Sequence, residues 1–308
     1  MNETFNIFLA SPRGFCAGVE RAIETVKQCL EKYGQPIYIL HEIVHNRHVI
    51  EELQKSGAVF VEHLEHIPRG EVCIFSAHGV SKGVEKQASE LGLRTVDATC
   101  PLVNSVHTMV EKYHLLDYDV LIIGHHNHPE VEGAAGRVSG RVYVVADEKE
   151  AREVSVIDPD KVAYVTQTTL CKDDVDGILN ILDKRFPKIK RPRSSICFAT
   201  QNRQNAVKQL AGRSDLLLVV GSKNSSNSNR LKEVAMQCGV KAHLIDDQND
   251  ILPEWLKGVE KIGITAGASA PERLVNGVVD WMMRHGGGDI KEMEGIKENI
   301  HFKPAVLD

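Results

Sequence analysis

The sequence predicts an α/β protein built on parallel sheets. Short β-branched or leucine-rich runs alternate with amphipathic helical patterns along almost the whole chain. Continuous apolar strands that are each followed by a helix are typical of a parallel sheet covered on both faces. Glycine closes several helical patterns, as expected for the residue just past a helix end. With 308 residues, the chain is long enough to bury an ample hydrophobic core.

Six apolar runs predict strands, at residues 37–40, 72–76, 120–124, 162–166, 216–221 and 261–265. Helical patterns follow them, such as HVIEELQKSG after the first run and GVEKQASELG after the second. In open α/β sheets, ligands bind beyond the carboxyl ends of the strands. The loops after these strands are therefore where we expect the functional site.

Three cysteines share one local context. Cys16, Cys100 and Cys197 each stand where an apolar run gives way to a loop and then to an amphipathic helix. Their separations are far too long for a C-x-x-C zinc knuckle, so we expect one ligand from each of three similar α/β units. Three thiolates that meet without a fourth partner suit a metal or iron–sulfur centre with an open position.

The other four cysteines fall in different contexts. Cysteine outside a metal site usually behaves as a small buried hydrophobe. Cys29 and Cys238 lie within or at the end of helical patterns and Cys73 lies inside a strand, so we expect structural roles for all three. Cys171 follows TQTTL, close to the expected site, and the sequence assigns it no role.

Grouping the loops by cysteine predicts three α/β modules around a central site. The modules span 17–100, 101–197 and 198–285. The terminal segments, 1–16 and 286–308, are expected to brace one module. Sequence identity between the modules is too weak to establish an internal repeat.

Composition excludes several classes of protein. A net charge of −5 and a pI near 6.3 argue against a nucleic-acid binder, which usually carries a basic excess. The N-terminus has no basic n-region, so we do not expect a secretory signal. No apolar run approaches the roughly 20 residues that span a bilayer. We therefore expect a soluble cytoplasmic protein with reduced cysteines.

The segment HEIVH, from His41 to His45, matches the zinc-protease pattern H-E-x-x-H. That pattern binds zinc only where both histidines lie one turn apart on a helix. Here the match begins at the end of a strand and the helical pattern starts near Asn46, so the two histidines are not expected to share a helical face.

Three polar loops suggest an anion site. SKNSSNSNR opens a helical pattern with hydroxyls, amides and backbone N–H groups, which favour negative charge, and TQTTL and GASAP are similar. Each loop alone is also consistent with a well-capped helix. Together with the loop histidines His45, His78 and His128, they indicate a small metabolite that carries phosphate. Neither a P-loop nor a strand-linked dinucleotide motif occurs.

A carboxyl group follows the strand at 120–124. Glu130 stands two residues after His128, and a carboxyl near buried redox chemistry is a natural proton source because desolvation raises its pKa. Glu132 is equally close in the sequence, so position alone does not decide between them.

Eight motifs together resemble the 4-hydroxy-3-methylbut-2-enyl diphosphate reductase family. They cover essentially the whole chain, in the order PRGFCAGVERAI, HEIVHN, FSAHGVS, DATCPLV, GHHNHPEVEG, TQTTL, VVGSKNSSNSNRL and TAGASAP. The resemblance implies three α/β modules arranged as a trefoil around a [4Fe–4S] cluster. Cys16, Cys100 and Cys197 would hold the cluster, whose fourth iron would be open to substrate.

The resemblance also implies a reaction and a substrate site. The reaction is reductive dehydroxylation of an allylic diphosphate to isopentenyl and dimethylallyl diphosphate, with two electrons and two protons. The electrons would come from a ferredoxin- or flavodoxin-type protein. Glu130 and Thr168 would lie near the allylic hydroxyl. Seven residues would contact the diphosphate: His45, His78, His128, Ser225, Ser226, Asn227 and Ser269.

Some points remain open at this stage. The roles of His125, His126 and Cys171 are not assigned, and the third cysteine is followed by FATQNRQ, where more hydroxyl groups would be expected. The basic stretch at 184–193 is consistent with two roles: a docking site for an acidic electron carrier, or a solvated linker between the second and third modules. Two alternative functions are a zinc-dependent hydrolase of a phosphorylated metabolite and a redox-inactive phosphometabolite-binding protein.

Overall fold

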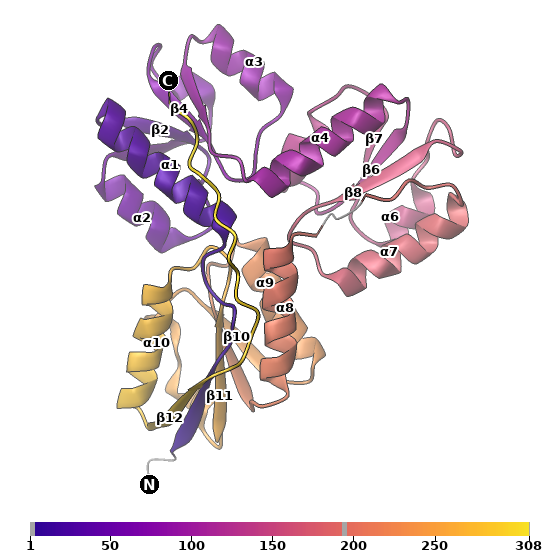
Figure 1. Ribbon diagram of the computed structural model, residues 1–308. Helices are drawn as coiled ribbons and strands as arrows, with labels where there is room; N and C mark the ends of the chain where they lie inside the picture. The colour runs from indigo at the N-terminus through magenta and orange to yellow at the C-terminus, as the bar shows by residue number, and fades with distance from the viewer. Residues whose placement is uncertain (1–3, 193–195, 308) are drawn as a thin grey trace. The chain divides into compact units, whose positions relative to one another are not determined.

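The computed structural model describes residues 4–192 and 196–307, whose path is drawn in Figure 1. These residues form twelve strands, ten α-helices and three short 3-10 helices. Every pair of neighbouring strands is parallel, and the strands form three separate sheets. The predicted α/β class is confirmed. The chain divides into two compact units, which are described in turn.

Unit 1 comprises Met1–Ala17, His45–Glu51 and Phe198–His301. It contains the largest sheet, in the order β10-β9-β11-β1-β12. The five strands are β1 (Phe5–Leu9), β9 (Leu216–Val220), β10 (Lys241–Ile245), β11 (Lys261–Ala266) and β12 (Gly287–Glu292). The first and last strands in the sequence are therefore neighbours in this sheet.

Helices cover both faces of the sheet in unit 1. Figure 1 shows α10 (Glu272–Arg284) on one side, with α8 (Phe198–Ala211) and α9 (Ser226–Gln237) on the other. Val275, Val278 and Met282 of α10 pack against β-branched and leucine residues of β1, β9 and β11. Three shorter elements belong wholly or partly to this unit: α2 (Arg47–Lys55), η2 (Gln248–Asp250) and η3 (Pro253–Leu256).

Unit 2 comprises Gly18–Val44, Glu52–Cys197 and Phe302–Asp308, and it contains the other two sheets. One sheet has the order β3-β2-β4-β5. Its strands and the associated helices are β2 (Ile37–Leu40), β3 (Ala58–Val61), β4 (Val72–Phe75), β5 (Arg94–Asp97), α1 (Ala17–Tyr33), α3 (Lys82–Glu90) and η1 (Leu64–His66).

The remaining sheet of unit 2 has the order β7-β6-β8. Its elements are α4 (Pro101–Leu115), β6 (Asp119–Ile123), α5 (Pro129–Ala135), β7 (Val142–Val145), α6 (Glu148–Glu153), β8 (Val162–Thr166) and α7 (Lys172–Arg185). The central strand β6 is buried on both faces: Leu121 and Ile123 pack on the α7 side, whereas Val120 and Ile122 pack on the α4 side. This explains its continuous apolar sequence.

All six predicted strands are present, as β2, β4, β6, β8, β9 and β11. Of the other six strands, β1 and β5 lie in the apolar runs that precede Cys16 and Cys100. The remaining four, β3, β7, β10 and β12, were not predicted, and each lies at a sheet edge. All four are only partly buried. The sequences of β10 and β12 are also interrupted by polar or charged residues, whereas β3 and β7 are apolar. The predicted module boundaries stay a prediction. Within the described residues, no helix combines the length and apolar character needed to cross a membrane.

Candidate active site

The twelve predicted site residues fall into two groups. Unit 1 holds Cys16, His45, Ser225, Ser226, Asn227 and Ser269, and unit 2 holds His78, Cys100, His128, Glu130, Thr168 and Cys197. Each group is described within its own unit. Almost all of these residues follow the carboxyl end of a strand or stand at the start of a helix, as predicted.

The three predicted cysteine ligands have the same backbone setting. Each directly precedes the first residue of a helix, and each backbone N–H donates to a carbonyl two residues past the end of a strand. The bonds are Cys16 to Ala268 (3.1 Å), Cys100 to Ala77 (3.0 Å) and Cys197 to Thr168 (3.1 Å). All three cysteines therefore stand in the same backbone environment at the start of a helix.

Solvent exposure separates these cysteines from the rest. Cys16, Cys100 and Cys197 are half-buried residues. Cys29 and Cys73 are buried, as predicted for structural residues, and burial raises their thiol pKa to about 11 and about 12. Cys238 differs from the prediction: it follows the last residue of α9 and is exposed, so it does not fill a core.

Glu130 and Thr168 are in direct contact. Glu130 lies in the first turn of α5 and is only 3% exposed. Its Oε1 accepts the backbone N–H of Thr168 at 2.6 Å, and its Oε2 lies 3.0 Å from Thr168 Oγ1. Thr168 follows β8, so the pair joins the loops at the carboxyl ends of two neighbouring strands, β6 and β8.

Burial controls the ionisation of Glu130. Desolvation raises the pKa of its carboxyl from 4.5 to about 7, and the two hydrogen bonds from Thr168 oppose part of that rise. Glu132, the alternative acid, is exposed. The raised pKa allows the Glu130 carboxyl to exchange a proton near neutral pH.

His128 lies beside Glu130, and His78 lies beside His128. His128 caps α5, with its Nδ1 accepting the backbone N–H of Glu130 at 3.2 Å. An Nδ1 that accepts requires the proton of the neutral ring to be on Nε2, where it can be donated to a ligand. The rings of His78 and His128 meet edge to face, with centroids 6.0 Å apart.

In unit 1, the predicted phosphate loop leads into α9. Ser225 is the helix N-cap and accepts the backbone N–H of Ser228 at 3.3 Å. Ser228 is fully buried beside Gly221 and Gly267, which directly follow β9 and β11. A Cβ on either glycine would overlap the Ser228 hydroxyl. Both glycines are therefore needed to bring the start of α9 against the strand ends.

The same corner of unit 1 holds an unsatisfied amide. Asn227 is 5% exposed, and within the described residues neither atom of its side-chain amide has a hydrogen-bond partner. Buried polar groups are normally paired, so this amide is suited to a polar ligand. His45 and Ser269 are neighbours, since Ser269 Oγ donates to His45 O at 2.9 Å.

Three open points are clarified by the structure. Neither His41 nor His45 lies in a helix, because β2 ends at Leu40 and α2 begins at Arg47, so HEIVH is not a zinc-protease helix. His126 is exposed and contacts Glu150, with 2.9 Å between His126 Nε2 and a Glu150 oxygen. Cys171 is a buried residue that directly precedes α7.

The donor set suits an iron–sulfur cluster by its chemistry. It offers three half-buried cysteines, each directly before a helix, and thiolates are the usual ligands of such clusters. Across residues 4–192 and 196–307, no three His, Cys, Asp or Glu side chains are grouped in a way that could hold a single metal ion.

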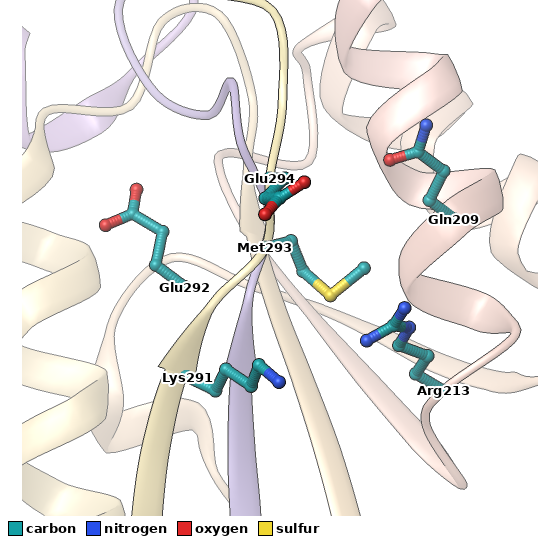
Figure 2. A pocket seen from close by; sticks show the side chains of 6 residues that line it. All are labelled: Gln209, Arg213, Lys291, Glu292, Met293 and Glu294. Atoms are coloured by element: carbon teal, nitrogen blue, oxygen red, sulfur yellow. The ribbon is translucent and has the colours of Figure 1, made fainter.

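A cavity of about 610 Å³ lies elsewhere in unit 1. Figure 2 shows Gln209 and Arg213, from the end of α8 and the turn after it, facing the residues at the end of β12. The lining there is Lys291, Glu292, Met293 and Glu294. None of these is a predicted site residue, and the mixture of opposite charges favours no one ligand.

Comparison with known proteins identifies the family. Residues 7–283 match the model of the LytB protein family. The chain belongs to the LytB family. A relative from Desulfotalea psychrophila is 62% identical over 99% of this chain and 98% of its own length, and one from Ectopseudomonas mendocina is 53% identical over 96% of each. Both are named 4-hydroxy-3-methylbut-2-enyl diphosphate reductase.

Comparison with solved structures supports the same family assignment. The reductase from Plasmodium falciparum matches with a TM-score of 0.93 and 38% identity, over 96% of this chain and 94% of that one. A second structure is described as the terminal enzyme of the non-mevalonate pathway. It matches with a TM-score of 0.67 and 31% identity, over 91% of this chain and 99% of that one.

Proposed function

We propose that this protein is a 4-hydroxy-3-methylbut-2-enyl diphosphate reductase. The observation that carries the proposal is the equivalent backbone setting of three half-buried cysteines in a chain of the LytB family. The reaction adds two electrons and two protons to the allylic diphosphate, breaks the C–O bond of its hydroxyl, and releases water with isopentenyl or dimethylallyl diphosphate.

We propose that Cys16, Cys100 and Cys197 hold a [4Fe–4S] cluster. When bound, such a cluster supplies electrons one at a time and an open iron that acts as a Lewis acid toward the departing oxygen. Their equivalent positions, each directly before a helix, support this ligand set. Cysteine binds iron as the thiolate, so cluster binding would release the thiol protons.

Glu130 and Thr168 are suited to deliver the proton that turns hydroxide, a poor leaving group, into water. Oε1 of Glu130 is occupied by the backbone N–H of Thr168, so the transferable proton belongs on Oε2. Oε2 lies 3.0 Å from Thr168 Oγ1, and a hydroxyl can accept one proton while donating its own. The proton would thus pass from Glu130 to Thr168 and then to the allylic hydroxyl.

The diphosphate would bind to the polar loops. The start of α9, with Ser225, Ser226 and the unsatisfied amide of Asn227, offers donors to phosphate oxygens. Ser269 and the histidines His45, His78 and His128 would complete the set. Binding energy from the diphosphate is remote from the reacting carbon and helps to orient the allyl group.

The electrons would come from a ferredoxin- or flavodoxin-type protein, and the reaction would take place in the cytoplasm. The reduced state of seven cysteines is expected in that compartment. The one-electron transfer of a cluster suits such carriers and requires no hydride cofactor.

Metal analysis after anaerobic purification tests the proposal against its alternatives. We expect a coloured protein with iron and sulfide in equal amounts, four of each per chain, and conversion of the allylic diphosphate in the presence of a reductant. A colourless protein with zinc would support the hydrolase. Pyrophosphate binding without any metal would support the redox-inactive binding protein.

A further inference from the structure

Two arginine side chains donate hydrogen bonds to the backbone carbonyls that precede two of the cysteines. Arg203 lies in α8 and is 1% exposed, among the largest fully buried side chains of the described residues. Its Nε and NH2 donate to Gly14 O at 3.0 and 2.8 Å, and NH2 also donates to Phe15 O at 3.0 Å. Phe15 directly precedes Cys16, so the guanidinium holds the two carbonyls before this cysteine.

The hydrogen-bonding capacity of Arg203 is fully used. Its NH1 donates to Ala199 O at 2.9 Å and to the Glu298 carboxylate at 3.0 Å, in addition to the bonds from Nε and NH2. A guanidinium has five N–H donors in a fixed planar fork. Lysine has neither the planar fork nor the five donors, so it cannot reproduce this arrangement.

Arg21 repeats the arrangement in unit 2. It lies in α1, and its NH1 donates to Thr99 O at 2.8 Å. Thr99 directly precedes Cys100. NH2 of Arg21 reaches Asp97 O at 3.3 Å, and Nε donates to Lys303 O at 2.9 Å.

The peptide unit before each of these two cysteines is therefore fixed at both polar atoms. For Cys16, the carbonyl of Phe15 is held by Arg203 and the N–H by Ala268 O. For Cys100, the carbonyl of Thr99 is held by Arg21 and the N–H by Ala77 O. Gly14 adopts φ of +69°, a left-handed conformation that favours glycine, and its carbonyl is the one that accepts two bonds from Arg203.

We propose that Arg203 and Arg21 are positioning residues that hold Cys16 and Cys100 in a fixed backbone conformation for cluster binding. The proposal rests on the proposed function, because the cluster belongs to it. A ligand that is already ordered loses less conformational entropy when it binds a metal. The guanidinium also places positive charge one peptide unit from a thiolate that must carry negative charge.

The test compares three arginine-to-lysine variants. Arg203→Lys and Arg21→Lys keep the positive charge but remove the hydrogen bonds that the planar guanidinium donates to the backbone carbonyls. Arg185→Lys is the matched control: Arg185 also donates to two backbone carbonyls, of Ala151 at 2.6 Å and Val154 at 2.7 Å, and none of the cysteines adjoins these residues. Arg21 is only half-buried, so its variant is expected to fold even if replacement of the fully buried Arg203 prevents folding.

The first measurement is the rate at which an anaerobic chelator removes iron from the reconstituted full-length protein. We expect release to be about 10-fold faster or more in Arg203→Lys and Arg21→Lys, the size of effect usual for residues that orient metal ligands. Release from Arg185→Lys should match the wild type.

The second measurement is amide hydrogen exchange, which does not depend on turnover. Arg203→Lys should speed exchange at the Cys16 amide and leave Cys100 unchanged, and Arg21→Lys should do the reverse. A merely global loss of stability would speed both amides alike, and that result would overturn the positioning role.

The remaining outcomes separate this inference from the proposed function. If wild-type protein takes up no iron and sulfide, the proposed function is wrong and the positioning role falls with it. If wild-type protein carries the cluster but Arg203→Lys and Arg21→Lys release iron at the wild-type rate, the positioning role alone is wrong.

Discussion

At the residue scale, burial and hydrogen bonding act on the Glu130 carboxyl in opposite directions. Its carboxyl is almost completely buried, yet both of its oxygens are hydrogen-bonded by a single residue, Thr168. Burial stabilises the neutral acid, whereas the hydrogen bonds stabilise the carboxylate. The balance places the pKa at about 7, so both forms are accessible near neutral pH.

Replacing Glu130 by glutamine should remove the proton donor and keep the cluster. Glutamine preserves the size of the side chain and can still accept the Thr168 N–H, but it has no proton to transfer. We expect turnover to fall by about 100-fold or more, the effect usual for loss of a general acid. Glu132→Gln is the control and should retain activity. Near wild-type turnover in Glu130→Gln would show that Glu130 is not the acid.

The raised pKa of Glu130 should make the stability of the folded protein depend on pH. Folding raises its pKa from 4.5 to about 7, so the folded protein binds this proton more tightly than the unfolded chain does. Between these two pKa values, the unfolded chain has lost a proton that the folded protein keeps. The contribution of Glu130 to the free energy of unfolding therefore falls as pH rises, by about 3 kcal/mol at most.

Thermal unfolding of the metal-free protein between about pH 4 and 8 measures this dependence. Glu130→Gln lacks the titrating group, so its melting temperature should decline less than that of the wild type over this range. Parallel curves for the two proteins would contradict the raised pKa.

The cysteines give a third prediction at this scale. Serine in place of Cys16, Cys100 or Cys197 should reduce iron content sharply, because a neutral hydroxyl is a poor ligand for iron in a cluster. Serine at Cys29, Cys73 or Cys238 should leave iron content unchanged, although the two buried positions are expected to lose some stability. Full cluster occupancy in Cys197→Ser would refute the three-ligand hypothesis.

Some residues of the site could not be predicted from sequence. The buried setting of Glu130 depends on Thr168, which comes from a different strand end, so position in the chain could not separate Glu130 from Glu132. Arg203 was missed because the carbonyls it holds, near Cys16, are distant in sequence. Cys238 lies at the end of a helix as predicted, but the direction of its side chain decides its exposure.

At the scale of elements, the start of α9 depends on close packing as well as on its cap. Ser225 is the N-cap, which agrees with the capped helix that the sequence offered as the alternative to an anion site. Ser228 was not predicted, although it packs against the two glycines that follow β9 and β11. The sequence shows small residues at all three positions, but only the fold reveals that they touch.

Gly267→Ala should therefore weaken binding of the phosphate groups. The new Cβ would overlap the Ser228 hydroxyl, so either this hydroxyl must leave its hydrogen bond to Ser225 Oγ or the first turn of α9 must shift. We expect calorimetry with inorganic pyrophosphate to show about 10-fold weaker affinity, since roughly 1.4 kcal/mol of lost interaction corresponds to that factor.

Gly83→Ala is the matched control for this variant. Gly83 lies in α3, where a Cβ would make only an ordinary contact with Ser81 Oγ at 3.6 Å. Alanine there should favour the helix slightly and leave binding unchanged. Equal pyrophosphate affinity in Gly267→Ala and Gly83→Ala would show that the position of the α9 turn does not matter.

Strand prediction succeeded where burial is greatest. The central strands β6 and β9 are buried at every position and read as continuous apolar runs. The edge strand β12 is mostly exposed, contains two glycines and three charged residues, and has no apolar pattern. Its place in the sheet is set by pairing with β1, a contact between the two ends of the chain that local sequence cannot report.

At the scale of the whole molecule, charge is the feature most relevant to the electron donor. The chain is acidic overall, and the stretch at 184–193 is its basic exception. Residue 193 lies outside the described residues. Lys188 pairs with Asp160 at 3.1 Å and Arg191 pairs with Asp183, whereas Lys190 is exposed. Part of the positive charge is thus already balanced within the protein, which lowers the expected effect of the stretch on a partner.

Charge reversal of Lys188, Lys190 and Arg191 tests docking of an acidic electron carrier. Complementary charges chiefly raise the association rate, so we expect reduction by an acidic ferredoxin to slow by about threefold or more at low salt. The difference should shrink as salt screens exposed charges. Reduction by dithionite should not change, because a small reductant needs no docking surface.

Lys86→Glu provides the surface-charge control for this experiment. Lys86 is an exposed residue of α3, outside the basic stretch. Lys86 forms an ion pair with Glu90 at 3.7 Å. Reversing its charge therefore breaks a surface ion pair, as charge reversal of Lys188 does. If Lys86→Glu slows the ferredoxin as much as the triple variant, net charge acts without a docking surface. Reduction of the triple variant at the wild-type rate at every ionic strength would exclude this stretch as the docking surface.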